Sequence, residues 1–360
     1  MGGGGAVIDW TLSGRTTSMR YVRVSWPDMG ELGEIKGVTG CTIEENSLSA
    51  LKVSGTLDYA DMDDIGDDMI RIYSDSEAGG KRETVCHATL FATTPESTWS
   101  GESRTGAADM YSVLWVMQQG GPEGTYTVEA GQNAVSVAAK IARDCNLAVV
   151  ATASDKTVAT SHTWDDGASW LEIANWLLDF AGFGSATVDA FGNVIMAPYV
   201  DPGEKAVAWT FSDTVSGVSD SEISHEYDTY CVPNVVRAVC SNADGDPMVA
   251  VAINDDPENP YSTVRRKKRI VRTETLSDIA DQAALEAKAR ELLLSGMSVV
   301  EKIEIGHSWA CFNIGDAVQI DYWKSGKVMK MAAVARTCKM TPDLDCTTTV
   351  RRFVNLLEVS

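Results

Sequence analysis

The stretch GASWLEIANWLLDFAG, residues 167–182, has the clearest periodicity in the chain. Its apolar residues recur at positions i, i+3, i+4, i+7, i+8 and i+11, and they are Trp170, Ile173, Ala174, Leu177, Leu178 and Ala181. This spacing places them on one face of an α-helix. Asp166 or Ser169 can cap the start of the helix, and Gly182 can end it. The stretch therefore predicts an amphipathic helix that covers a core.

The same spacing occurs 36 residues earlier in the chain, which indicates an internal repeat. The earlier positions are Ala134, Val137, Ala138, Ile141, Ala142 and Cys145. An extended segment follows each helix, at 147–152 and at 186–190, and Gly192 with Asn193 predicts a hairpin turn after the second. We therefore expect residues 117–205 to form a small α+β module with repeated helix–strand units.

Short strands are predicted before this module. Val22, Val24 and Trp26 alternate with polar residues, as expected of a strand with one buried face. Turns rich in Gly and Asp separate such strands at short intervals. Residues 1–116 are therefore predicted to form a first β-rich domain.

Strands return after the module, and residues 206–360 are predicted to form a second β-rich domain with one long helix. A hairpin is expected around the turn at 242–247. Ser277 and Asp278 are the expected caps of the helix, and Gly296 is its expected end. The apolar stripe of this helix is predicted at Ile279, Ala283, Ala287 and Leu294.

The composition limits the classes of function. The chain has 360 residues, with 30 Lys and Arg residues against 51 Asp and Glu residues, and its formal net charge is -21. This charge opposes tight binding of nucleic acid, although an acidic wall would let a DNA duplex slide past. The N-terminus reads as neither a signal peptide nor an anchor, and no stretch reaches the ~18 apolar residues of a membrane span. We expect synthesis in the cytoplasm and no stable membrane insertion.

The cysteines and histidines do not indicate a metal site. The eight cysteines are scattered without close pairs, so buried free thiols are the expectation. Cys86 and His87 are adjacent, but neighbours on a strand point to opposite faces and do not easily share an ion. We predict no cofactor.

No sequence signature of catalysis is present. A nucleophile elbow of the GxSxG type and a papain-like cysteine motif are both missing from the sequence. The 51 acidic residues make coincidental carboxylate pairs abundant, and nothing singles out two of them as a glycosidase pair. We nominate no catalytic residue.

One basic run stands out in this acidic chain. It consists of Arg265, Arg266, Lys267, Lys268 and Arg269. The run could contact DNA phosphates or an acidic partner surface, and it could also be an ordinary solvated strand or loop. We favour contacts between subunits over DNA, because the net charge opposes DNA capture.

Several short motifs follow one another in a fixed order along the chain. They are Gly66-Asp67, Leu90-Phe91, Tyr111-Ser112-Val113-Leu114, Pro233-Asn234-Val235-Val236, Asp256-Pro257, Asn259-Pro260-Tyr261-Ser262-Thr263 and Gly315-Asp316-Ala317-Val318. The fourth motif and the two that follow it are the most specific. In this order the motifs resemble the phage tail hub, or baseplate hub, proteins found at the tail tip of long-tailed phages.

The resemblance implies an α+β fold that is mainly β, with two barrel-like tail-tube-type β domains and an inserted small α+β module. It implies a structural, non-enzymatic protein whose homotrimeric ring adapts the sixfold tail tube to the tip and surrounds the channel for DNA and the tape measure. The implied partners are the distal tail protein, the tape-measure protein and tail fibre or spike proteins, with viral DNA only as passing cargo. The implied location is the virion tail tip, after assembly in the host cytoplasm.

Two other functions are kept as alternatives. A tail-associated cell-wall hydrolase would need two acids that converge in a deep groove. A host-glycan-binding tail-tip module would need exposed tryptophans on one face of a sandwich. For Trp164, Trp170, Trp176 and Trp309 we favour ordinary core positions over either interfaces or sugar binding.

Overall fold

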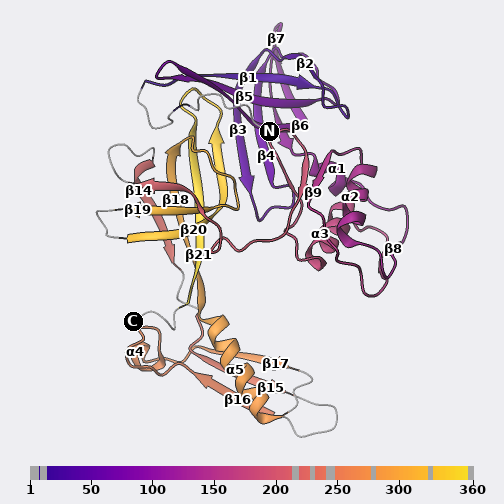
Figure 1. Ribbon diagram of the computed structural model, residues 1–360. Helices are drawn as coiled ribbons and strands as arrows, with labels where there is room; N and C mark the ends of the chain where they lie inside the picture. Colours follow the sequence, from indigo (N-terminus) through magenta and orange to yellow (C-terminus); the bar gives the residue numbers. More distant parts are fainter. Residues whose placement is uncertain are drawn as a thin grey trace. The chain divides into compact units, whose positions relative to one another are not determined.

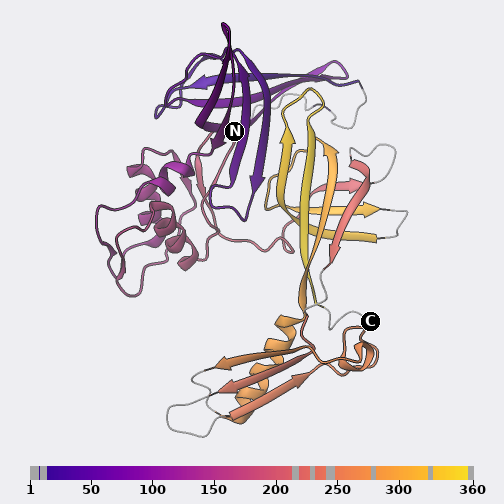
Figure 2. The same cartoon turned by 180° about the vertical axis from the view of Figure 1, so that it is seen from behind.

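The computed structural model describes residues 8, 14–212, 219–227, 232–240, 248–276, 281–322 and 327–355. Figures 1 and 2 show the chain as a ribbon from two opposite sides. The turn predicted at 242–247, the predicted caps Ser277 and Asp278, and Ile279 of the predicted stripe lie outside the described residues.

The chain divides into two compact units. The first unit comprises Met1–Glu222 and Ile305–Thr349, and the second unit comprises Ile223–Glu304 and Val350–Ser360. The structure is mainly β, as the sequence predicts, and its described strands form one sheet of 13 strands and three smaller sheets. The division of the strands into two barrel-like domains stays a prediction, as do the domain boundaries after 116 and 205.

The first seven strands form one antiparallel part of the large sheet, in the order β3-β4-β7-β6-β5-β1-β2. They are β1 (Thr16–Val24), β2 (Glu31–Glu34), β3 (Val38–Asn46), β4 (Val53–Ala60), β5 (Met69–Ala78), β6 (Lys81–Ser100) and β7 (Ser103–Tyr111). Val22 and Val24 of β1 are buried, in agreement with the predicted alternation. Trp26 lies just beyond the end of β1 and packs edge-on against Phe91 at 5.0 Å between ring centroids.

Strands from the C-terminal part of the chain join the same sheet. They are β13 (Val207–Ser212), β14 (Ser219–Tyr227), β18 (Ser298–Ser308), β19 (Ala317–Tyr322), β20 (Lys327–Lys339) and β21 (Asp345–Asn355). β20 pairs with β3 antiparallel, so that Cys338 lies opposite Ile43. Both side chains are buried in one apolar core together with Leu57 and Trp309. Elements from the two ends of the sequence thus complete a single core in the first unit.

The module at 117–205 contains the two predicted helices. Its elements, with the short helix that precedes them, are α1 (Leu114–Gln119), β8 (Tyr126–Val128), α2 (Ala134–Asp144), β9 (Val149–Ala151), β10 (His162–Trp164), α3 (Trp170–Phe180), β11 (Thr187–Val188) and β12 (Val194–Met196). Asn133 caps α2 and Ser169 caps α3, each by accepting a hydrogen bond from a backbone N–H in the first turn. Gly182 follows α3 with a φ of +76°, a conformation that favours glycine. Both predicted helices are confirmed.

The module is packed onto the sheet of the first unit. Val24, Met69 and Phe91 of the sheet share one apolar core with the helices of the module. The turn between β11 and β12 adds a polar contact, because the Ala190 carbonyl oxygen accepts a hydrogen bond from Thr89 Oγ1 at 2.8 Å. The Phe191 carbonyl oxygen accepts another from Arg71 at 3.3 Å. A Cβ at Gly192 would lie 2.7 Å from the end of the Met29 side chain, so this turn fits closely against its surroundings.

The second unit contains a small sheet covered by one helix. Its further elements are β15 (Val235–Cys240), β16 (Met248–Ile253), α4 (Thr263–Arg266), β17 (Val271–Leu276) and α5 (Gln282–Gly296). β15 pairs antiparallel with β16, as the predicted hairpin requires, and parallel with β17. In Figure 1, α5 lies along one side of these three strands.

The predicted stripe of the long helix is wrong. The side chains of α5 that are buried are Leu285, Ala289 and Leu293, which recur every four residues. Ala283 and Ala287 are exposed, and so is Leu294. The helix begins after Asp281, whose side chain accepts a hydrogen bond from the Ala284 N–H, and it ends at Gly296 as expected. Several residues of this helix are alanine, which is compatible with a buried or an exposed face. The sequence pattern therefore allows two different apolar stripes.

The expectation that all cysteines are free thiols is also wrong. Cys338 and Cys346 form a disulfide bond. The turn between β20 and β21 brings their Cα atoms to 4.2 Å, although the two cysteines are eight positions apart in sequence. The geometry of the turn therefore decides this pairing. The spacing of the cysteines in the sequence did not reveal it.

Candidate interaction site

The most specific sequence motif forms a buried hydrogen-bond network in the second unit. Asn234 is fully buried at the start of β15. Its Nδ2 donates to the carbonyl oxygens of Tyr261 (3.4 Å) and Lys268 (3.0 Å). Its Oδ1 accepts from the Ile270 N–H at 2.8 Å. Asn234 therefore fastens the loop at 261–270 to the sheet, since a buried amide paired at both ends is costly to remove.

Two further asparagines extend this network, and we call Asn234, Asn254 and Asn259 the asparagine clamp. All three are buried. Asn254 Nδ2 donates to Asn259 Oδ1 at 3.2 Å, and the same oxygen accepts from the Tyr261 N–H at 2.9 Å. Ser262 is also buried, and its Oγ caps α4. The motif residues thus serve as a scaffold, and the chain that they hold is the basic run.

The structure brings the basic run together in one short turn, which we call the basic segment (Arg265, Arg266, Lys267, Lys268 and Arg269). Arg265 and Arg266 end α4, and Lys267 has the left-handed φ of 52°. The Arg266 guanidinium lies over the Tyr261 ring at 5.0 Å, which is a cation–π geometry. Arg265, Lys267 and Arg269 are exposed, and none of them has an ion-pair partner among the described residues of the second unit.

The charges of the chain are distributed unevenly between the two units. The second unit holds 12 Lys and Arg residues against 15 Asp and Glu residues, which gives -3. The whole chain has 30 Lys and Arg residues and 51 Asp and Glu residues. The first unit therefore holds 18 Lys and Arg residues against 36 Asp and Glu residues, which gives a net charge of -18. Like charges crowded in the basic segment repel one another and favour contact with an acidic surface. The first unit of this same protein has such a charge.

The small sheet of the second unit has one face that α5 does not cover. On the covered face, Val236, Ala238, Ala250 and Ala252 are buried against α5. On the other face, the exposed fractions are 39% for Val249, 53% for Val251, 39% for Ile253 and 55% for Val271. Arg237 lies among them, opposite Val251, and it is exposed. We call Val249, Val251, Ile253, Val271 and Arg237 the open face.

The open face has a signal in the sequence that the predictions above do not use. β16 reads MVAVAI, with no polar residue at any of its positions. A strand with one solvated face normally alternates apolar and polar residues, whereas an unbroken apolar run is typical of a strand covered on both faces. The run in β16 is therefore typical of a strand covered on both faces, although Val249, Val251 and Ile253 are more than one-third exposed here.

Cys86 and His87 point in different directions, as predicted. The Cys86 Sγ donates a hydrogen bond to the Ala190 carbonyl oxygen at 3.3 Å, and burial raises the pKa of the thiol to about 12. The His87 ring lies edge-on to Trp309 and bonds Ser74 Oγ at 2.8 Å. Burial, with the Arg336 charge as a smaller cause, lowers the pKa of His87 to about 3. A thiol held protonated is a poor nucleophile and a poor metal ligand.

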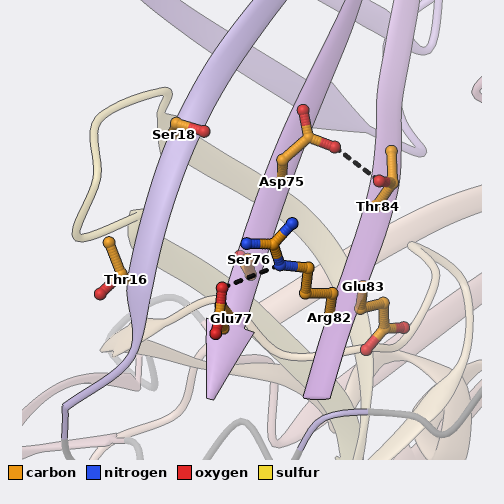
Figure 3. A pocket seen from close by; sticks show the side chains of 8 residues that line it. All are labelled: Thr16, Ser18, Asp75, Ser76, Glu77, Arg82, Glu83 and Thr84. Carbon is orange, nitrogen blue, oxygen red and sulfur yellow. Dashed lines mark hydrogen bonds and ion pairs between the residues drawn. The ribbon is translucent and has the colours of Figure 1, made fainter. Parts of the chain in front are cut away.

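A polar cavity of about 460 Å³ lies on β1, β5 and β6 (Figure 3). It is lined by Thr16, Ser18, Asp75, Ser76, Glu77, Arg82, Glu83 and Thr84. Burial acts to raise the pKa of Asp75, but hydrogen bonds from Thr84 and Arg20 outweigh it and hold the pKa below its usual value. Glu77 pairs with Arg82, and Glu83 accepts a hydrogen bond from the Ile8 N–H. A glycosidase acid needs a raised pKa, so Asp75 does not fit that role.

The four tryptophans that we assigned to the core have that role. Trp164 and Trp309 are buried. Trp170 and Trp176 are partly buried and pack against the core of the module. Among the described residues, Trp99 is the tryptophan with a large exposed fraction, at 65%, and a single ring is not a sugar-binding face.

Among the residues that the structure describes, no group of three or more His, Cys, Asp or Glu side chains could hold a metal ion. Within the same residues, no helix is both long enough and apolar enough to cross a membrane.

Comparison with known sequences gives no assignment. No protein-family model matches the chain, and no curated protein matches it. What the chain shares with known proteins is therefore found in its fold.

Solved structures of phage tail proteins are similar over nearly the whole chain. The tail protein from Neisseria meningitidis has 14% identity and a TM-score of 0.61, with 94% of this chain and 97% of that chain covered. The 43 kDa tail protein of prophage MuSo2 from Shewanella oneidensis has 10% identity and a TM-score of 0.60, with 94% and 98% covered. A chain of the half-lidded PdpA-VgrG complex of Francisella has 8% identity and a TM-score of 0.60, with 96% and 59% covered. The fold is thus that of phage tail proteins, and the resemblance that the motifs indicated is confirmed at this level.

Proposed function

We propose that this protein is a structural subunit of a phage-type tail tip, a baseplate hub that forms a homotrimeric ring. The ring would adapt the sixfold tail tube to the tip and surround the channel through which DNA and the tape measure pass. The observation that carries this proposal is the fold, which is shared with two tail proteins over 94% of this chain and nearly all of theirs. A fold shared from end to end supports a common structural role better than a shared module would.

The symmetry of the ring follows from the proposed domains. Residues 1–116 and 206–360 would each supply one barrel-like, tube-type β domain, with the module at 117–205 inserted between them. Three subunits would then present six similar domains, which matches a sixfold tube. The antiparallel pairing of β20 with β3 supports this arrangement, because it joins the two proposed domains edge to edge.

The charge of the chain suits a conduit. A wall with excess carboxylates repels DNA phosphates at long range, so a duplex can move past it without being held. The first unit, with 18 bases against 36 acids, is the part suited to line the channel. Viral DNA would accordingly be a passing cargo, and the protein would need neither a cofactor nor a catalytic residue.

The basic segment is proposed to lie at a boundary between subunits. Its exposed residues Arg265, Lys267 and Arg269 have no acidic partner among the described residues of the second unit, whereas the first unit of a neighbouring subunit is strongly acidic. Arg266 and Lys268 would take part from the same turn. Acidic surface on a neighbour would relieve the repulsion within the segment.

The other proposed partners are tail proteins. They are the distal tail protein, the tape-measure protein, and tail fibre or spike proteins, and the proposed location is the virion tail tip after assembly in the host cytoplasm. One similar structure belongs to a complex with VgrG, which supports the expectation that this fold works within an assembly.

Native mass and negative-stain imaging across a concentration series test the proposal. The wild-type chain is expected to form a trimeric ring with an open centre. Reversal of Arg265, Lys267 and Arg269 to Glu is expected to dissociate it. Reversal of Lys81, Arg143 and Lys156, three exposed bases of the first unit, makes the same change in charge and is expected to leave the trimer intact.

The outcomes separate the parts of the proposal. A trimer that survives the reversal of the basic segment would remove that segment from the subunit boundary. A wild-type chain that stays a compact monomer at every concentration would contradict the self-assembled ring. Release of sugars from bacterial cell walls by the purified chain would instead support the hydrolase alternative, which the partners of Asp75, Glu77 and Glu83 do not favour.

A further inference from the structure

The open face is a mainly apolar surface that no described residue of its own unit covers. Val249, Val251 and Ile253 come from β16 and Val271 from β17, and all four side chains are more than one-third exposed. Their cross-strand neighbours on β15 are Val239, Arg237 and Val235, of which Val235 is buried. On β17 the exposed Thr273 and Thr275 lie opposite Arg237 and Val239, so the apolar surface is concentrated on β16 with Val271 at one end. Contiguous apolar patches of this kind mark sites of protein interaction.

The only charged side chain of the open face is at its centre. Arg237 is exposed and makes no ion pair within the described residues. Arginine is enriched among the residues that contribute most to binding at protein interfaces. Its guanidinium forms strong, often bidentate, hydrogen bonds with carboxylates. The chemistry of the face therefore selects an occupant that is both apolar and acidic.

The basic segment lies at one end of the open face. Val235 pairs with Ile253 on one side and with Val271 on the other, and these three form the end row of the sheet. Asn234 precedes that row and holds the Lys268 carbonyl oxygen and the Ile270 N–H. The positive charges of the basic segment therefore lie next to this end row, where Asn234 of the asparagine clamp holds the segment.

We propose that each copy of this chain docks the open face, with the basic segment beside it, onto the acidic first unit of a second copy. The charges are complementary, because the occupant must supply acids and the first unit has 36 of them against 18 bases. The two surfaces in contact are different, and such a head-to-tail contact closes into a ring when the rotation between copies is right. This inference rests on the proposed ring and names the surface that builds it.

The test compares two glutamate substitutions in the full chain by sedimentation across a concentration series. Val251→Glu places a carboxylate in the middle of the open face. Leu294→Glu places the same charge on the solvent side of α5, where Leu294 is 47% exposed. If Val251 is buried between copies, Val251→Glu weakens association by about 30-fold or more, since an unpaired buried charge is costly. Leu294→Glu changes association by less than about threefold.

A second measurement does not depend on the folding of either variant. Unlabelled and nitrogen-15-labelled wild-type chains are mixed and cross-linked with a carbodiimide. This reagent links an amine directly to a carboxylate without a spacer. Cross-links of mixed isotope composition are expected to join Lys267 or Lys268 of one copy to carboxylates of the first unit of another copy.

The outcomes distinguish this inference from the ring itself. A wild-type trimer together with an equally stable Val251→Glu trimer overturns the inference and leaves the ring in place. Mixed cross-links confined to the second units of both copies overturn it as well, because two open faces would then meet each other. A wild-type chain that does not associate at all removes the ring and the inference together.

Discussion

The module at 117–205 and the second unit are both small α+β structures, but they differ in how completely their cores are covered. In the module, α2 and α3 pack together and Phe91 of the large sheet closes the core. In the second unit, α5 covers one face of three strands and the open face has no cover within the described residues of that unit. One region has its core covered on both sides, whereas the other leaves one face of its sheet partly exposed within its own unit.

The largest expected effects come from removing one buried leucine from each region. Leu177 of α3 and Leu285 of α5 are both fully buried, so either change to Ala is expected to lower the free energy of unfolding by about 2–5 kcal/mol. Urea titration gives the size of each effect, and hydrogen exchange shows which region loses protection. Leu294→Ala is the exposed control, expected within about 0.5 kcal/mol of wild type. A Leu285→Ala effect as small as that of the control would mean that α5 does not pack on its sheet in the free chain.

The next effect concerns the asparagine clamp. Asn234→Ala leaves the Ile270 N–H without its acceptor, and we expect a loss of about 1–3 kcal/mol in the free energy of unfolding. Amide exchange at 261–270 should accelerate. Asn193→Ala, in the β11–β12 turn, removes a bond to Asp189 in a less buried site and is the matched comparison, with an expected loss nearer 1 kcal/mol. Unchanged exchange at 261–270 would show that the clamp does not hold the basic segment.

The N-caps of α3 and α5 allow the same two regions to be compared through a smaller change in the free energy of unfolding. Ser169 accepts from the Glu172 N–H at 3.1 Å, and Asp281 accepts from the Ala284 N–H at 2.8 Å. Either change to Ala should lower the free energy of unfolding by about 1 kcal/mol, measured by urea titration. Ser169→Asn and Asp281→Asn should restore most of it, because asparagine caps as well. Failure of both rescues would exclude capping as the cause.

The smallest expected effect is that of Val251→Thr, which tests whether the open face is exposed in the dissociated chain. Threonine has the shape of valine, so Val194→Thr in the buried strand β12 should cost about 1–3 kcal/mol for the hydroxyl it buries. Val251→Thr should change the free energy of unfolding of the dissociated chain by less than about 0.5 kcal/mol. Both are measured at low protein concentration. Equal costs for the two variants would mean that Val251 is already covered within its own chain.

The two regions also differ in how far the sequence predicts them. Trp170, Ile173 and Leu177 are large apolar residues at helical spacing, so the face of α3 could be read directly. In α5, alanines stand at Ala283 and Ala287 on the exposed side and at Ala289 on the buried side. Alanine is compatible with both environments, and for this reason the stripe was assigned to the wrong side.

Contacts between distant segments had no local signal. The pairing of β20 with β3 joins strands that are about three hundred residues apart, and only the folded sheet reveals it. The Cys338–Cys346 disulfide likewise depends on the turn between two strands. The basic run could be seen in the sequence as a charge pattern. Of the residues that hold it, Asn234 and Asn259 belong to sequence motifs whose structural role the sequence did not show, and Asn254 had no signal in the sequence.

The turn between β11 and β12 adds hydrogen bonds between the module and the large sheet to the apolar core that the two share. Ala190 and Phe191 supply carbonyl oxygens to Thr89 and Arg71, and Gly192 leaves no space beneath the turn. A force applied to the module would therefore reach strands β5 and β6 through Arg71 and Thr89, in addition to the connecting chain segments.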